Sequence, residues 1–261
     1  INLSVSPGDT GVGGDVIVIA GDSTAGSSGT GGAISLTSGQ GTETSSGVFK
    51  IKTAAAGSSG ASGAIIMETG TSTREDGSGH IQLRSGDSSS GNSGDIDIHV
   101  GIGNSGAGGD VFFDAGDTST SFTGGSISLG AGYSVSASSG GIVMKTVNAG
   151  TSGVSGALSF TSGTTSRGAS GSITFATGTA TNGKGGNIVL SVSPGTESID
   201  PTDTGGDVIV RAGDSTGASV TGSGGAISLT TGLGTERSSG DFVVHTSNAG
   251  SSGVSGKLSF T

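Results

Sequence analysis

The chain has 261 residues, of which 57 are glycine, 49 serine and 32 threonine, while aromatic residues make up only 3% and charged residues 11%. The absence of cysteine excludes a disulfide scaffold, and the scarcity of large side chains excludes a conventional large-residue core. The net charge of -10 argues against nucleic acid and anionic membranes as partners, and no apolar run reaches the roughly 18 to 20 residues of a membrane-spanning helix.

Short apolar blocks recur along the whole chain. Each block after the first has the pattern glycine, any residue, apolar, any residue, apolar, and the first block has Ile1 in place of the glycine. Positions are numbered here from the first apolar residue. Position 1 falls at Leu3, Val16, Ile34, Phe49, Ile65, Ile81, Ile96, Val111, Ile127, Ile142, Leu158, Ile173, Ile188, Val208, Ile227, Phe242 and Leu258. The period of two predicts a strand in each block, with positions 1 and 3 pointing inward.

Small polar segments such as 41–47, 56–63 and 87–94 separate the blocks, with a mean spacing of about 16 residues from one block to the next. A unit this short cannot close a core alone, so it is expected to stack on copies of itself, with glycine supplying positive φ at the turns. The predicted fold class is therefore all-β: a parallel β-solenoid of about 17 coils, continuous over residues 1–261. At a spacing of about 4.8 Å, the coils would make a rod on the order of 80 Å long.

A longer period lies on top of the blocks. The sequence GGDVIVIAGDST at 13–24 returns as GGDVIVRAGDST at 205–216, with a looser copy, GGDVFFDAGDTS, at 108–119. These copies are six blocks apart, which gives a super-repeat of about 96 residues. Neither end shows a capping element, so we expect residues 1–261 to belong to a longer chain or to a filament.

Position 2 of each block is expected to point away from the interior. It is large and apolar in seven blocks, and we take these residues as a hypothetical lateral interface: Ile17, Ile66, Phe112, Val143, Val189, Ile209 and Val243. Scattered exposed apolar residues are the alternative interpretation. A regular apolar spot on a flat face is, however, typical of contact with a repeating partner.

The motifs that resemble catalytic, cofactor or metal sites are weak. Residues 178–185 resemble a phosphate-binding loop, but Gly185 replaces the required serine or threonine, and residues 101–106 match GxGxxG without a helix to follow. We expect no enzyme activity, because charged residues are too sparse to converge in a cleft. No cofactor is expected either.

A metal site is also not expected. His80, His99 and His245 do not share a site, and the corner residues Asp22, Asp117 and Asp214 lie six blocks apart with no calcium-binding nonapeptide. We expect these aspartates to cap their own turns. Basic residues such as Arg84 and Arg211 are expected to balance the aspartates that directly precede a block, which are Asp15, Asp95, Asp110, Asp207 and Asp241.

The segments GGDVIVIAGDST, GGAISLTSG and GSSGASGAI resemble the Gly/Ser/Thr-rich β-solenoid repeats of secreted microbial and algal filaments and surface appendages, such as flagellar-hair shafts and adhesin stalks. The resemblance implies an extracellular or cell-surface location. The leading hypothesis is a structural protein that forms the rod of such a filament by end-to-end and lateral self-association. The alternative is a monomeric adhesin or ice-binding module that uses one flat face. Serine and threonine residues, and the Asn2 sequon, are candidate glycan acceptors.

Overall fold

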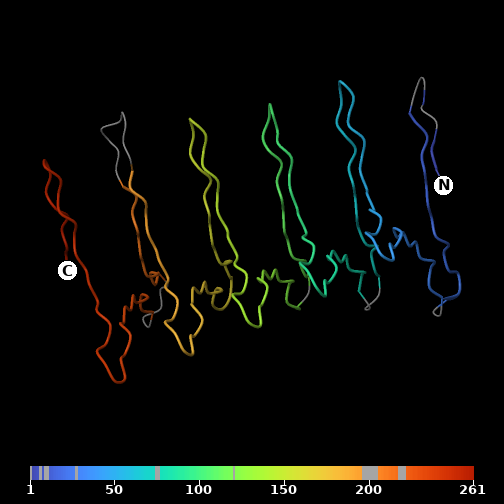
Figure 1. Ribbon diagram of the computed structural model, residues 1–261. Coiled ribbons are helices and arrows are strands. Elements are labelled where there is room, and N and C mark those ends of the chain that lie inside the picture. The colour runs from blue at the N-terminus through green and yellow to red at the C-terminus, as the bar shows by residue number, and fades with distance from the viewer. Residues whose placement is uncertain are drawn as a thin grey trace. The chain divides into compact units, whose positions relative to one another are not determined.

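The computed structural model describes residues 2–5, 8, 12–26, 29–73, 77–119, 121–195, 205–216 and 222–261, and this part contains no α-helix and no β-strand (Figure 1). The expected all-β parallel solenoid is therefore wrong for this chain. The strand that the period of two predicted in each block is absent, because the blocks of the described part form no hydrogen-bonded ladder. The described residues are irregular coil punctuated by bends.

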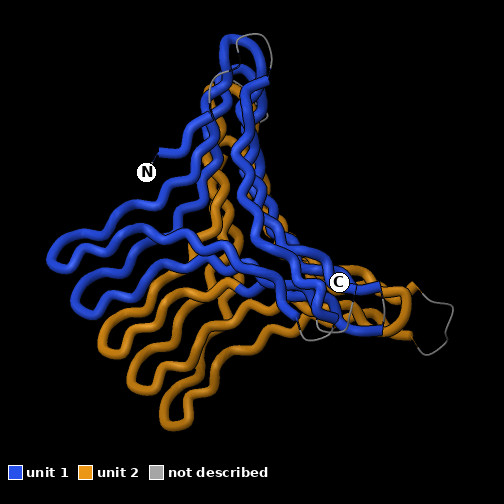
Figure 2. The backbone as a smooth tube through the Cα atoms, turned by 90° about the vertical axis from the view of Figure 1, so that its right-hand side faces the viewer, with its two compact units in different colours: residues 1–128 blue, residues 129–261 orange. Residues whose placement is uncertain are grey.

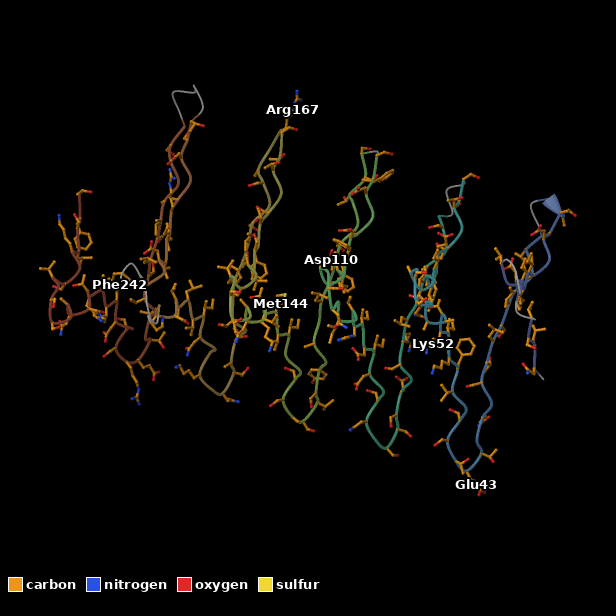
Figure 3. All side chains as sticks on the ribbon, turned by 90° about the horizontal axis from the view of Figure 1, so that it is seen from above. Glu43, Lys52, Asp110, Met144, Arg167 and Phe242 are labelled. Atoms are coloured by element: carbon orange, nitrogen blue, oxygen red, sulfur yellow. The ribbon has the colours of Figure 1, made fainter. Side chains whose placement is uncertain are left out.

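The chain divides into two units, residues 1–128 and 129–261. Each unit is a succession of long hairpins, as the tubes in Figure 2 show. The bends at 42–44, 89–91 and 166–168 fall inside the small polar segments, as expected from their glycine and serine content. Two labelled residues, Glu43 and Arg167, lie at hairpin tips in Figure 3. The polar segments therefore form the tips, and the apolar blocks lie where one hairpin leads into the next.

The missing ladder has a direct structural cause. Among the described residues, every backbone-to-backbone hydrogen bond joins residues of a single hairpin, and none joins one hairpin to another. A stack of coils would need those bonds, because neighbouring strands of a sheet lie about 4.8 Å apart and exchange them along their whole length. The hairpins of the described part thus exchange no backbone hydrogen bonds with one another.

The glycine that opens each block has a structural reason. It lies opposite the end of the preceding block, on the other arm of the same hairpin. A Cβ added at Gly63 would lie 3.7 Å from the Thr53 side chain, and one added at Gly125 would lie 3.0 Å from the backbone nitrogen of Gly116. A contact of this kind, within 4 Å, recurs at Gly14, Gly32, Gly47, Gly63, Gly79, Gly94, Gly109, Gly125, Gly140, Gly156, Gly171, Gly186, Gly206, Gly225, Gly240 and Gly256. We call these the closing glycines. At six of them the Cβ would come within 2.5 to 3.3 Å of the other arm, so glycine lets the arms approach there: Gly14, Gly32, Gly109, Gly125, Gly186 and Gly206. At the other ten the distance of 3.4 Å or more is ordinary van der Waals contact.

The hydrogen bonds confirm the six-block period. The N–H of a closing glycine donates to a backbone carbonyl across the hairpin in six loops: Gly32 to Gly21, Gly125 to Gly116, Gly225 to Gly213, Gly47 to Gly39, Gly140 to Gly132, and Gly240 to Gly232, at 2.8 to 3.0 Å. The first three loops are six blocks apart, and so are the last three. The super-repeat read from the sequence is therefore also a repeat of hydrogen bonding.

Positive φ occurs where turns were expected to need glycine. Gly26, Gly60, Gly77, Gly153 and Gly168 have φ between 41° and 125°, and no other residue type has positive φ in the described part. These angles favour glycine because a Cβ there would clash with the backbone. The prediction that glycines make the corners is confirmed at these five positions.

The described residues form no core, and none of their side chains is buried. Apart from Leu3, the position 1 residues are 48% to 63% exposed, whereas the apolar position 2 residues are 74% to 82% exposed. Position 1 is thus less exposed than position 2, whereas position 3 ranges from 46% at Val5 to 87% at Phe260. The expectation that positions 1 and 3 fill an interior is wrong, because successive hairpins leave these side chains uncovered.

Candidate self-association surface

The exposed surface is far too large for a self-sufficient folded chain. It measures 25626 Å² for a mass of 24.4 kDa. A folded monomer of this mass exposes about 10,000 Å², and its fully extended chain exposes about 35,000 Å². The single chain therefore stays closer to the extended limit than to the folded one, and it lacks the apolar burial that normally offsets chain entropy.

The seven residues of the hypothetical lateral interface all lie in the described part, and all are strongly exposed. The least exposed are Ile17 and Val243 at 74%, and the most exposed is Ile209 at 82%. Ile66, Phe112, Val143 and Val189 lie between these values. The side chains are available for contact, but no described residue covers them, so the interface itself stays a prediction.

The residues at positions 1 and 3 form a second exposed apolar surface, which the sequence did not predict. Position 3 residues such as Leu36, Met67 and Leu129 are each 70% exposed, although they were expected in the interior. One contact does link neighbouring blocks, since the rings of Phe160 and Phe175 meet edge to face with centroids 6.4 Å apart. The signal was present in the composition, because a block with two large apolar residues in about 16 cannot bury them alone.

The geometry does not assemble a catalytic or metal site in the described residues. No group of three or more His, Asp or Glu side chains that could hold a metal ion occurs there. An open hollow is lined by Lys145, Thr146, Val147 and Asn148, without a second charged group. The phosphate-loop look-alikes at 101–106 and 178–185 contain bends at 104–106 and 181–183, with no helix after them.

The aspartate corners are only partly as expected. Asp214 accepts a hydrogen bond from the Arg211 guanidinium, with Nη2 and Oδ2 2.5 Å apart, so Arg211 does balance an aspartate, although not one that precedes a block. In the equivalent turn after Val16, Asp22 was expected to accept a hydrogen bond from the turn. The acceptor is instead the Oγ of Ser23, which accepts the Ala25 N–H at 3.4 Å. The Arg211–Asp214 pair is 75% and 65% exposed, so it is a weak surface ion pair.

The sequence matches no protein-family model, no curated protein and no solved structure. The described residues also include no helix long and apolar enough to cross a membrane.

Proposed function

We propose that this chain is a structural protein that assembles with copies of itself into the rod of an extracellular filament or surface appendage. The observation that carries the proposal is the exposure of the apolar blocks throughout the described chain. Contiguous apolar surface on this scale marks an interaction site, and here it recurs with every block. A chain built from one repeated unit presents the same surface along its length, which suits a partner with the same repeat.

The unpaired backbone also supports self-association. The described residues form nine backbone-to-backbone hydrogen bonds outside regular elements, whereas folded proteins form roughly one hydrogen bond per residue. Extended edges with free N–H and C=O groups are templates for pairing with another chain. Copies of this chain would satisfy both deficits at once, because they carry the same apolar blocks and the same edges.

The extracellular location rests on the resemblance to secreted Gly/Ser/Thr-rich repeat proteins. It fits the hydroxyl-rich hairpin tips and the exposed Asn2, which opens an N-linked sequon. Mass measurement of the intact native protein would test this part, since O-linked or N-linked sugars add mass beyond 24.4 kDa.

The main test is sedimentation of the purified chain over a range of concentrations, with negative-stain electron microscopy of the same samples. We expect concentration-dependent growth into elongated particles, and loss of ordered structure on dilution. A compact, folded monomer of 24.4 kDa at every concentration would overturn the proposal. Ile17→Lys together with Phe112→Lys should weaken any lateral contact, while Ser35→Lys with Ser128→Lys places the same charges at position 2 of other blocks.

A further inference from the structure

We propose that the assembling unit is three copies of this chain wound about a common axis, so that each block lies between the preceding and the following block of the other two copies. This inference rests on the proposed function and specifies its partner. It concerns contacts between chains, in which the blocks of different copies pair as neighbouring strands. The described part of the single chain shows no such pairing.

The directions of the hairpins define the symmetry. Within each unit, successive hairpins point in three directions about the axis, and every third hairpin points the same way (Figure 2). A rotation of about 120° therefore brings the hairpins of a copy into the same three directions. A twofold pair of copies would not, because a rotation by 180° places hairpins between those directions. A closed, symmetric assembly of three copies fits this arrangement.

Hairpins that share a direction are three blocks apart in sequence, and no backbone hydrogen bond joins them in the described part. Suppose that the three copies differ only by a rotation about the axis, with no shift along it. Along the axis, the neighbour of block n of one copy is then block n+1 of a second copy, and the next neighbour is block n+2 of the third copy. Each turn of one chain would then rise by about three strand spacings, roughly 14 Å, with two other chains between its turns.

The charges at position 4 support this order independently. In five successive blocks this position holds Lys52, Glu68, Arg84, His99 and Asp114. Neighbours one block apart, as in the three-chain arrangement, place Glu68 between Lys52 and Arg84. Opposite charges on adjacent strands stabilise the pair, and like charges destabilise it.

Stacking of the chain on its own turns would give the reverse result. Neighbours three blocks apart place Lys52 beside His99, and Glu68 beside Asp114. The Glu68–Asp114 pair is then of like sign, which is unfavourable on adjacent strands. The sequence therefore disfavours contact between a chain's own turns at these blocks, in agreement with the lack of backbone hydrogen bonds between hairpins in the described part.

Other columns do not discriminate between the two orders. Opposite charges three blocks apart occur at Lys50 and Asp97 and at Asp207 and Lys257. In adjacent blocks, Asp241 and Lys257 are of opposite sign, whereas Asp95 and Asp110 are of like sign. The argument from charge therefore rests on the Lys52–Glu68–Arg84 alternation at position 4.

The first experiment reverses one charge. Glu68→Lys places a third cation between Lys52 and Arg84, and we expect the concentration for half-assembly to rise by about tenfold. The triple variant Lys52→Glu, Glu68→Lys, Arg84→Glu restores the alternation and should recover assembly. Glu43→Lys, at a hairpin tip, makes the same change in net charge and is the matched control (Figure 3). Stacking of the chain on its own turns predicts the opposite, because the substituted side chain would then attract Asp114. If Glu68→Lys assembles more strongly than the native chain, the proposal is wrong.

The second experiment uses cross-linking, which is clean because the chain has no native cysteine. Gln82→Cys with Asp97→Cys places thiols at position 2 of adjacent blocks, and a short bismaleimide should give covalent species up to three chains on a denaturing gel. Gln82→Cys with Ser128→Cys places them three blocks apart and should leave single chains. Internal cross-links in the second variant, or no species of three chains in the first, would overturn the three-chain arrangement.

The two levels of the proposal fail differently. A sample that sediments as fibres but shows the wrong cross-links refutes the three-chain order and leaves the proposed structural role intact. A sample that stays a folded monomer refutes both.

Discussion

Loops 39–47 and 132–140 occupy the same place in successive super-repeats, and they show which features the repeat preserves. Both have the same length, the same bend positions and the same closing hydrogen bond at 2.9 Å, from Gly47 to Gly39 and from Gly140 to Gly132. Their tips differ. The repeat thus preserves how the arms are joined and leaves the tip free to vary.

The difference lies at one half-buried position, which is Gly41 in the first loop and Ser134 in the second. A Cβ at Gly41 would lie 2.6 Å from the carbonyl oxygens of both Thr44 and Ser45. In the second loop, the Ser134 hydroxyl accepts the Ala137 N–H at 3.0 Å. Carbonyls therefore face this position in one loop, and an N–H faces it in the other. One loop length supports two peptide orientations, and the residue at the position matches the orientation.

The largest effect is expected when a side chain is forced into the glycine form of the loop. Gly41→Ala should destabilise loop 39–47 by about 1–3 kcal/mol, because the backbone oxygens must move away from the new Cβ. Gly39→Ala, which meets nothing within 4 Å, is the matched control. Hydrogen exchange of the Gly47 amide measures the result, and equal protection in both variants would show that the two tips are interchangeable.

The same test can be repeated in the third copy of the loop. A Cβ at Gly234 would lie 2.5 Å from the carbonyl oxygens of Arg237 and Ser238, so Gly234→Ala should open loop 232–240 as Gly41→Ala opens its own loop. Faster exchange of the Gly240 amide is the expected result. Unchanged exchange there would limit the glycine requirement to the first copy.

A smaller effect is expected in the serine form. Ser134→Ala removes the acceptor of the Ala137 N–H and should cost about 0.5–1.5 kcal/mol, reduced by the partial exposure of the site. Ser136→Ala in the same tip is the control, and exchange of the Gly140 amide is the measurement. A loss as large as that of Gly41→Ala would contradict the distinction between the two loops.

The smallest effect is expected at the corner ion pair. Arg211→Gln removes the pair with Asp214, which the equivalent positions Ile19 and Asp114 lack in the other copies. Because both side chains are largely exposed, the change should be below about 0.5 kcal/mol. Hydrogen exchange of the Gly225 amide, measured in high and low salt, checks this. A large, salt-dependent loss of protection would show that the ion pair makes this corner differ from its copies more than the two loop tips differ from each other.

The sequence predicted the local features of the chain well. The glycine corners and the six-block super-repeat are visible in the structure, for example in the matched bonds at Gly32 and Gly125, whereas the strand expected in each block is not. These features depend on residues close in sequence, where backbone geometry and side-chain size set the conformation. Part of the candidate self-association surface was predicted. The residues at position 2 were expected to be exposed and are, whereas the residues at positions 1 and 3 were expected to be buried and are exposed as well.

The solenoid prediction failed on a non-local question. Alternation tells which side of a strand a residue occupies, as Ile17 and Val16 show by their different exposure, but it does not tell what covers that side. Coverage depends on how far apart successive turns lie, and that distance is set by pairing between segments about 48 residues apart, which no local pattern fixes. The sequence by itself determined the blocks, their register and their repeat. Only the tertiary structure decided that the described part of the chain does not pair with its own turns, because stacking them would require hydrogen bonds and apolar contacts that one copy does not supply.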